Sequence, residues 1–210
     1  RIKTAMDAGR TFVAIMPNPW PNYVRLAHLL NKFQVDCRRL HTFNMDEYAS
    51  DDGRIAPETW DLGFMHAFKK YFWSQLDAKL RPPEKNVQGP TDKNIKVYGK
   101  MIADLGGADI CYSGPGWTGH LAFIDPNAPE FAASSLDDWK QLGPRVCTLH
   151  PLTIAQNART SGGGNVTLAI TSDTLRWGPS TGSRTLAANG TAMALKVAAT
   201  TWRLTGDGIT

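Results

Sequence analysis

Residues 113–126 read SGPGWTGHLAFIDP, and this stretch decides the fold more than any other part of the chain. The apolar run before it, residues 108–112 (ADICY), is typical of a short buried strand. Three glycines and a proline within residues 114–119 then end that strand and open a tight loop. In an open α/β sheet, ligands bind outside the carboxyl ends of the strands. A histidine just past the loop, His120, can exchange protons there near neutral pH, with the carboxylate of Asp125 five residues further on.

The rest of the chain alternates between the two kinds of hydrophobic pattern. Short apolar runs predict strands at residues 11–16, 39–44, 108–112, 145–149, 166–170 and 184–188. Helical spacing of apolar residues predicts helices at residues 21–33, 58–76, 92–105, 136–139 and 191–204, with a glycine-rich break at 161–164. This alternation predicts the α/β class, with a mostly parallel sheet covered by helices on both faces. We expect one domain over residues 1–210.

Composition limits the classes of partner. The formal net charge is +4, and the Lys and Arg residues are scattered, with the densest cluster at residues 37–39 (CRR). A nucleic-acid-binding protein would gather its positive charge on one face, so we expect no nucleic-acid partner. No apolar stretch approaches the roughly 18 residues that span a bilayer, and the first residues do not resemble a signal peptide. We therefore expect a cytoplasmic protein with no membrane partner.

The cysteines and histidines give no metal or disulfide pattern. Cys37, Cys111 and Cys147 are far apart, and the last two fall inside apolar, strand-like runs. That arrangement is typical of buried, reduced thiols in a cytosolic protein. The histidines other than His120 show no ligand spacing, so we expect no metal site and no cofactor.

A second group of polar residues follows the strand predicted at 39–44. Residues 42–48 read TFNMDEY, which places Asp46 and Glu47 at the same carboxyl edge of the sheet as the histidine loop. Each feature alone has a plain structural interpretation. Adjacent acids after a strand commonly form a turn or cap a helix, a single histidine is commonly a satisfied, partly buried side chain, and Asp125 before a proline is typical of a loop. The conjunction of the two motifs, in order and at strand ends, favours a functional site.

Together, FNMDEY at residues 43–48 and GHLAFIDP at residues 119–126 resemble the glucosamine-6-phosphate deaminase/isomerase family, and the likeness runs from about Thr11 to Gly208. The resemblance implies a Rossmann-like three-layer fold. It also implies aldose–ketose isomerisation of an amino-sugar phosphate, coupled to loss of ammonia. By position, Asp46 would be the base that moves a proton between C1 and C2, and Glu47 would line the same pocket. His120 would assist ring opening, while Asp125 would hold its imidazole in one tautomer.

The chain departs from the family pattern where substrate would bind. Thr118 stands where relatives carry an aspartate, and residues 17–21 (PNPWP) replace a Thr-Gly-Gly-Thr type loop that cradles phosphate. Ile154 and Met193 stand where an arginine and a lysine are expected. We therefore expect a small-molecule sugar or sugar phosphate as partner, altered specificity, and a possible homo-oligomer. The candidate substrate-binding residues are Asn18, Gly114, Gly116, Thr118, Gly119 and Thr191.

Two alternative functions remain open at this point. A hydrolase related to 6-phosphogluconolactonases would share the fold and a Gly-His loop. The Asp46–Glu47 pair and residues 123–126 (FIDP) are closer to the deaminase pattern. A sugar-binding sensor without catalysis is favoured by Thr118 and by the missing phosphate contacts.

Overall fold

The computed structural model describes residues 1–17 and 22–160. Of residues 161–210 it describes the backbone of the strands at 166–168, 174–177, 180–181, 184–198 and 201–209. The chain forms two compact units, residues 1–149 and residues 150–210. Each unit is described by itself below, and a single domain over the whole chain stays a prediction.

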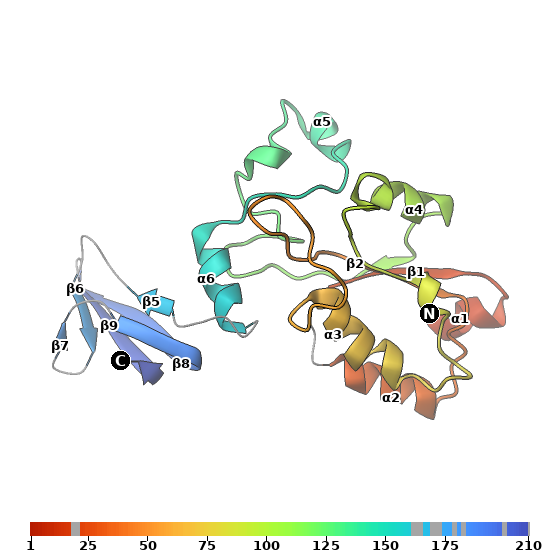
Figure 1. Ribbon diagram of the computed structural model, residues 1–210, viewed down its shortest axis with the longest axis horizontal. Coiled ribbons are helices and arrows are strands. Elements are labelled where there is room, and N and C mark those ends of the chain that lie inside the picture. The colour runs from red at the N-terminus through yellow and green to blue at the C-terminus, as the bar shows by residue number, and fades with distance from the viewer. Residues whose placement is uncertain are drawn as a thin grey trace. The chain divides into compact units, whose positions relative to one another are not determined.

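The first unit is built on a four-stranded parallel sheet (Figure 1). Its strands are β1 (Phe12–Met16), β2 (Leu40–Asn44), β3 (Val87–Gln88) and β4 (Ile110–Cys111), in the spatial order β3-β2-β1-β4. On one side of β1, Phe12 pairs with Leu40 and Met16 with Asn44 of β2. On the other side of β1, Ala14 pairs with Ile110 of β4. The strand order reverses between β1 and β4, and this is the topological switch point at which open α/β sheets bind ligands. The predicted α/β class is confirmed.

Helices cover both faces of this sheet, which gives three layers. Alternate residues of β1 point to opposite faces. Phe12, Ala14 and Met16 pack in one core cluster with α1 (Ile2–Asp7), α2 (Tyr23–Lys32) and α3 (Phe64–Tyr71). Val13 and the partly buried Ile15 pack on the other face with Phe43 and α4 (Tyr98–Asp104).

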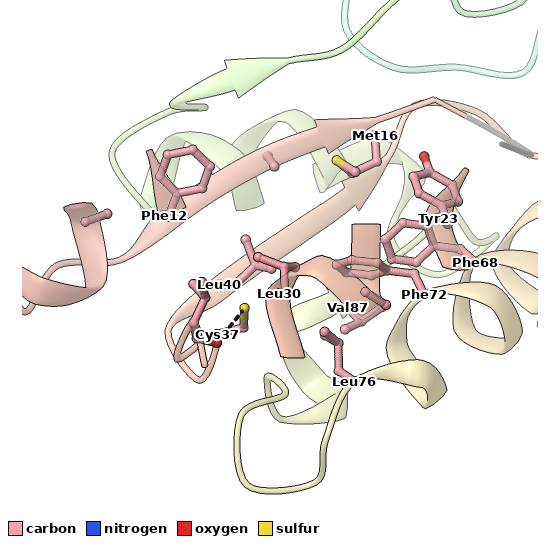
Figure 2. Close-up of a cluster of buried hydrophobic side chains, with 14 of the residues drawn as sticks. Phe12, Met16, Tyr23, Leu30, Cys37, Leu40, Phe68, Phe72, Leu76 and Val87 are labelled. Atoms are coloured by element: carbon pink, nitrogen blue, oxygen red, sulfur yellow. Dashed lines mark hydrogen bonds between the residues drawn. The ribbon is translucent and has the colours of Figure 1, made fainter. Parts of the chain in front are cut away.

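The larger of the two clusters is mainly aromatic and aliphatic (Figure 2). The Tyr23 ring meets Phe68 edge-on with ring centroids 5.0 Å apart, and Phe68 lies 5.1 Å from Phe72. Cys37 is fully buried in this cluster, and burial raises the pKa of its thiol to about 12. The expectation that Cys111 and Cys147 are buried is wrong, because Cys111 is exposed and Cys147 is half-buried.

Two elements of the first unit differ from the sequence-based expectation. The helix predicted at 58–76 is shorter, since residues 58–63 form turns and α3 is followed by a 3-10 helix at Trp73–Gln75. The strand predicted at 145–149 is absent. This segment instead attaches by side chains, because Arg145 Nη1 donates to Glu130 O (2.9 Å) and Thr148 Oγ1 to Glu130 Oε1 (2.6 Å).

The remaining helices of the first unit are short. Three are 3-10 helices, at Glu84–Asn86, Ile95–Val97 and Pro129–Phe131. The predicted helix near 136–139 is confirmed as α5 (Leu136–Lys140), whose Ser135 hydroxyl accepts from the Asp138 amide at 3.1 Å. That bond satisfies one of the free amides at the helix start.

The second unit contains α6 (Pro151–Thr160) and a five-stranded sheet. The strand order is β5-β8-β9-β6-β7, and all pairs are antiparallel except β6 with β9. A mostly parallel arrangement therefore holds for the first unit alone. The helix predicted at 191–204 is wrong, because residues 191–198 fall in β8 and residues 201–204 in β9. The strands are β5 (Val166–Leu168), β6 (Thr174–Trp177), β7 (Ser180–Thr181), β8 (Arg184–Ala198) and β9 (Thr201–Ile209).

The glycine-rich break predicted at 161–164 lies outside the described residues. Across the part of the chain that the structure describes, every helix is too short or too polar to cross a membrane.

Candidate active site

Asp46 lies just past the carboxyl end of β2. The amide of the preceding residue, Met45, donates to Met16 O at 2.9 Å, so the chain leaving β2 stays beside the end of β1. Burial raises the pKa of both Tyr23 and Tyr98, and the charge of Asp46 raises it further in each case. Because Tyr23 belongs to the α2 side of the sheet and Tyr98 to the α4 side, Asp46 lies near the sheet edge that both sides reach.

Glu47 caps a helix. Its carboxylate accepts hydrogen bonds from the amides of Tyr48 (3.0 Å), Phe64 (2.9 Å) and Met65 (2.8 Å). The last two are the first amides of α3, which have no partner within the helix. Burial raises the pKa of Glu47, and the three amide bonds oppose that shift. Glu47 therefore caps the start of α3. That Glu47 also lines a pocket stays a prediction.

The histidine loop leaves β4 along the same edge. The Tyr112 amide donates to Ile15 O at 3.0 Å, which extends the contact with β1 beyond the strand. The loop then closes on itself, since the Gly116 amide donates to His120 O (2.8 Å) and the Gly119 amide to Gly116 O (3.0 Å). Gly119 has φ +86°, a conformation that requires glycine here.

The imidazole of His120 is joined to Asp125 through Thr118. The Thr118 Oγ1 lies 3.0 Å from His120 Nδ1 and donates to Asp125 Oδ1. The direct distance from His120 Nδ1 to Asp125 Oδ1 is 3.4 Å. Both His120 and Asp125 are buried, with 9% and 4% of their surfaces exposed. The sequence-predicted pair is thus brought together, with a hydroxyl placed between its members.

Gly116 lies against a face of the same ring. A Cβ atom at position 116 would lie 2.0 Å from His120 Nε2 and 2.3 Å from Cε1. Glycine therefore keeps side-chain atoms out of the space beside Nε2. At Gly114, two residues earlier, an added Cβ atom would have no neighbour within 4 Å.

Aromatic rings connect the two motifs. The ring of Phe123 lies 5.3 Å from His120, 5.9 Å from Tyr48 and 5.6 Å from Phe64. Tyr48 directly follows the Asp46–Glu47 pair, so the segment after β2 and the loop after β4 pack on each other. Both motifs therefore contribute to one region at the carboxyl edge of the sheet.

Cys147 marks the same region, and the sequence did not single it out as a site residue. Its Sγ donates to Phe123 O at 3.4 Å. Burial raises the pKa of the thiol, and the charges of Glu130, Asp125 and Asp46 raise it further. The charges of Asp46 and Asp125 thus both raise the pKa of the same thiol. In the sequence, Cys147 differs from its surroundings only by lying in an apolar segment after α5. That pattern is equally typical of a strand, so it does not indicate a site residue.

A groove of about 590 Å³ lies next to the histidine loop. It is lined by Gly119, Leu121, Ile124, Asp125, Pro126, Asn127, Ala128, Phe131, Ala132 and Trp139. Among the other predicted binding residues, Asn18 lies outside the described residues and Thr191 lies in β8 of the second unit. Within the described ranges, no three His, Cys, Asp or Glu side chains are grouped as metal ligands.

Comparison with known proteins agrees with this architecture. No protein-family model matches the chain. The chain is 33% identical over 165 residues to a glucosamine-6-phosphate deaminase of Aeromonas hydrophila, covering 74% of this chain and 55% of the relative. It is 28% identical over 149 residues to glucosamine-6-phosphate deaminase 1 of Giardia intestinalis, covering 69% of this chain and 49% of the relative. The chain spans about half the length of the curated relatives it matches.

The fold has a solved counterpart. The structure of a monomeric glucosamine-6-phosphate deaminase, from a study that places it in the NagB superfamily, matches with a TM-score of 0.52 at 15% identity. The match covers 75% of this chain and 71% of that one. The first unit is thus a Rossmann-like α/β fold, and both sequence motifs lie at the carboxyl edge of its sheet. In sequence the chain is similar to glucosamine-6-phosphate deaminases, over about half of the length of those relatives.

Proposed function

We propose that this chain carries the acid–base part of an active site that isomerises an amino-sugar phosphate and releases ammonia. The relatives are named for deamination of glucosamine 6-phosphate. The observation that carries the proposal is the hydrogen-bonded set of His120, Thr118 and Asp125 after β4, packed through Phe123 on the segment that holds Asp46. These residues supply a carboxylate base and an oriented imidazole at one sheet edge.

The two acids after β2 take different roles in this proposal. Asp46 is the base that transfers a proton between C1 and C2 of the open-chain sugar. Its short side chain follows a rigid strand end, which favours precise placement. Glu47 holds the start of α3 and so fixes the segment on which Asp46 lies. His120 handles the proton of the ring oxygen during ring opening.

We propose a reduced preference for the phosphorylated sugar. Residues 17–21 contain three prolines, which offer no amide hydrogen to a phosphate. Ile154 in α6 and Met193 in β8 stand at the positions where cations are expected. A charge-assisted hydrogen bond contributes about 1.5–3 kcal/mol, so losing two reduces phosphate preference by roughly two to four orders of magnitude. A cytoplasmic location and a homo-oligomer stay predictions.

The test measures ammonia release from glucosamine 6-phosphate and from glucosamine at one ionic strength. Asp46→Asn removes the basic carboxylate with little change of shape, so we expect kcat to fall by about 10²–10⁴-fold with binding nearly unchanged. Asp137→Asn, on the exposed surface of α5, is the matched control and should leave kcat unchanged.

Four results would contradict parts of this proposal. Asp46→Asn activity close to wild type would exclude Asp46 as the base. Sugar binding without turnover in the wild type would favour the sensor, and hydrolysis of 6-phosphogluconolactone without ammonia release would favour the lactonase. A preference for the phosphorylated sugar of about a thousandfold, the equivalent of about 4 kcal/mol, would show that other residues bind phosphate.

A further inference from the structure

The Thr118 hydroxyl lies between the imidazole and the carboxylate of the candidate site. We propose that Thr118 is a positioning residue that holds His120 in the tautomer with its proton on Nδ1, which makes Nε2 the basic nitrogen of the neutral ring. This inference rests on the proposed function for its kinetic consequence. The tautomer of His120 depends on the contacts among Thr118, His120 and Asp125, whatever reaction the site catalyses.

The direction of the two hydrogen bonds follows from the available protons. A hydroxyl carries one hydrogen and two lone pairs, whereas an ionised carboxylate accepts and cannot donate. Thr118 donates its hydrogen to Asp125 Oδ1. Its oxygen is therefore left to accept from His120, 3.0 Å away, and that bond requires hydrogen on Nδ1. In a neutral imidazole the other nitrogen, Nε2, then carries no hydrogen and is the basic nitrogen of the ring.

The direct path between the ring and the carboxylate is poorer. His120 Nδ1 and Asp125 Oδ1 are 3.4 Å apart, beyond the usual 2.7–3.2 Å of an N–H···O hydrogen bond. The shorter connection runs through the hydroxyl. The orientation of the ring therefore depends on Thr118 as well as on Asp125.

The surrounding loop keeps the hydroxyl in place. Thr118 is β-branched and has few χ1 rotamers, so holding its hydroxyl costs little side-chain entropy. The bond between the Gly119 amide and Gly116 O closes the loop immediately after Thr118. Gly116 packs against the face of the ring, where an added Cβ atom would lie 2.0 Å from Nε2. One short loop thus contacts both the Nδ1 edge and a face of the imidazole.

Two substitutions separate the hydroxyl from the shape of the side chain. Thr118→Val keeps the branched shape and removes the hydroxyl, and Thr118→Ser keeps the hydroxyl. The tautomer is read from imidazole ¹⁵N shifts at a pH where imidazoles are neutral, and the His120 signal is identified by its loss in His120→Gln. We expect the Nδ1–H form in the wild type and in Thr118→Ser, and loss of that preference in Thr118→Val.

The kinetic readout follows from the same change. With part of the imidazole in the wrong tautomer, Thr118→Val should lower kcat by about 10²-fold, the lower part of the range for general acid–base catalysis, with KM little changed. Thr118→Ser should stay close to the wild type. If Thr118→Val does not fold, Thr118→Ala removes the same hydroxyl without adding a methyl group and is read in the same way.

The outcomes distinguish this inference from the proposed function. An unchanged His120 tautomer in folded Thr118→Val or Thr118→Ala would overturn it, as would a changed tautomer in Thr118→Ser. Normal kcat in a hydroxyl-free variant would overturn its role in turnover. A wild type that releases no ammonia would refute the proposed function, and the ¹⁵N measurement would still decide the role of Thr118.

Discussion

Gly116→Ala tests whether the imidazole of His120 is held against the loop as the structure places it. The added Cβ would lie 2.0 Å from Nε2, 2.3 Å from Cε1 and 2.6 Å from Cδ2, and real Cβ atoms essentially never approach closer than 3.0 Å. The ring or the loop must therefore move by about 1 Å, a misplacement that can cost about 10²-fold in rate. Overpacking of this kind also costs about 1–3 kcal/mol in the free energy of unfolding.

Gly114→Ala is the matched control, because it lies in the same loop and has nothing within 4 Å of the new Cβ. Neither Gly114 nor Gly116 has a positive φ, so alanine fits the backbone at both positions. Gly119 is no control, since its φ of +86° would add strain of its own. We expect Gly114→Ala to match the wild type in the free energy of unfolding.

A double-mutant cycle makes this prediction independent of activity. Unfolding in urea is measured for Gly116→Ala in the wild-type background and in the His120→Ala background. If the clash is with the imidazole, most of the cost of Gly116→Ala disappears once the ring is removed, which gives a coupling energy within the roughly 0.5–3 kcal/mol seen for residues in contact. Equal costs in both backgrounds would refute the placement of His120 against Gly116, as would a Gly116→Ala variant with full stability and full activity.

Two further predictions concern buried polar groups near the sheet edge. The Thr42 hydroxyl is buried in β2 with no hydrogen-bond partner among the described residues, so Thr42→Val should raise the free energy of unfolding by about 1–3 kcal/mol, and a loss in urea denaturation would contradict this. Burial raises the pKa of Glu47 in the folded protein above its value in the unfolded chain. Ionisation of Glu47 therefore destabilises the folded protein as pH rises from the pKa of the unfolded chain through that of the folded protein. The stability of Glu47→Gln relative to the wild type should therefore improve as pH rises above about 4.3, whereas a decline would mean that the α3 amides lower that pKa.

The sequence allowed Asp46 and His120 to be placed because each follows a strand of the parallel sheet. Residues at the carboxyl ends of parallel strands meet at one edge whatever the details of the loops. Glu47 was harder to interpret, because its partners are the first amides of α3, 17 and 18 residues away along the chain. A sequence pattern alone does not show which helix start will lie beside a given carboxylate.

The misplaced start of α3 has a related cause. The apolar spacing that suggests a helix from residue 58 includes Trp60, which lies in a turn. Trp60 packs on Tyr48 with ring centroids 5.8 Å apart, and Phe64 packs on the same ring at 4.4 Å. Two aromatic residues four positions apart thus share a partner, as they would on a helix, although only the second is helical. The helix-like spacing of Trp60 and Phe64 therefore corresponds to a shared contact with Tyr48 and not to a continuous helix.

In the second unit, a segment predicted to be a helix is a strand. Residues 191–197 (TAMALKV) are rich in alanine and leucine, which favour helices. In the same segment the larger apolar side chains recur at every second position, at Met193, Leu195 and Val197, and this period of two is that of a strand. In the structure β8 pairs with β9 from Ala198 back to Leu186, so the long antiparallel ladder outweighs the local helix propensity.

Thr118 illustrates why a substitution within a motif has to be judged in three dimensions. By comparison with the family pattern, threonine at this position is the loss of an acid beside the histidine. In the structure its hydroxyl lies 3.0 Å from His120 Nδ1 and donates to Asp125 Oδ1. An imidazole with one ionised partner and one neutral partner remains oriented, and it faces less negative charge than it would between two carboxylates. The threonine therefore keeps a hydrogen-bonding partner beside the imidazole of His120 while it removes a negative charge from that position.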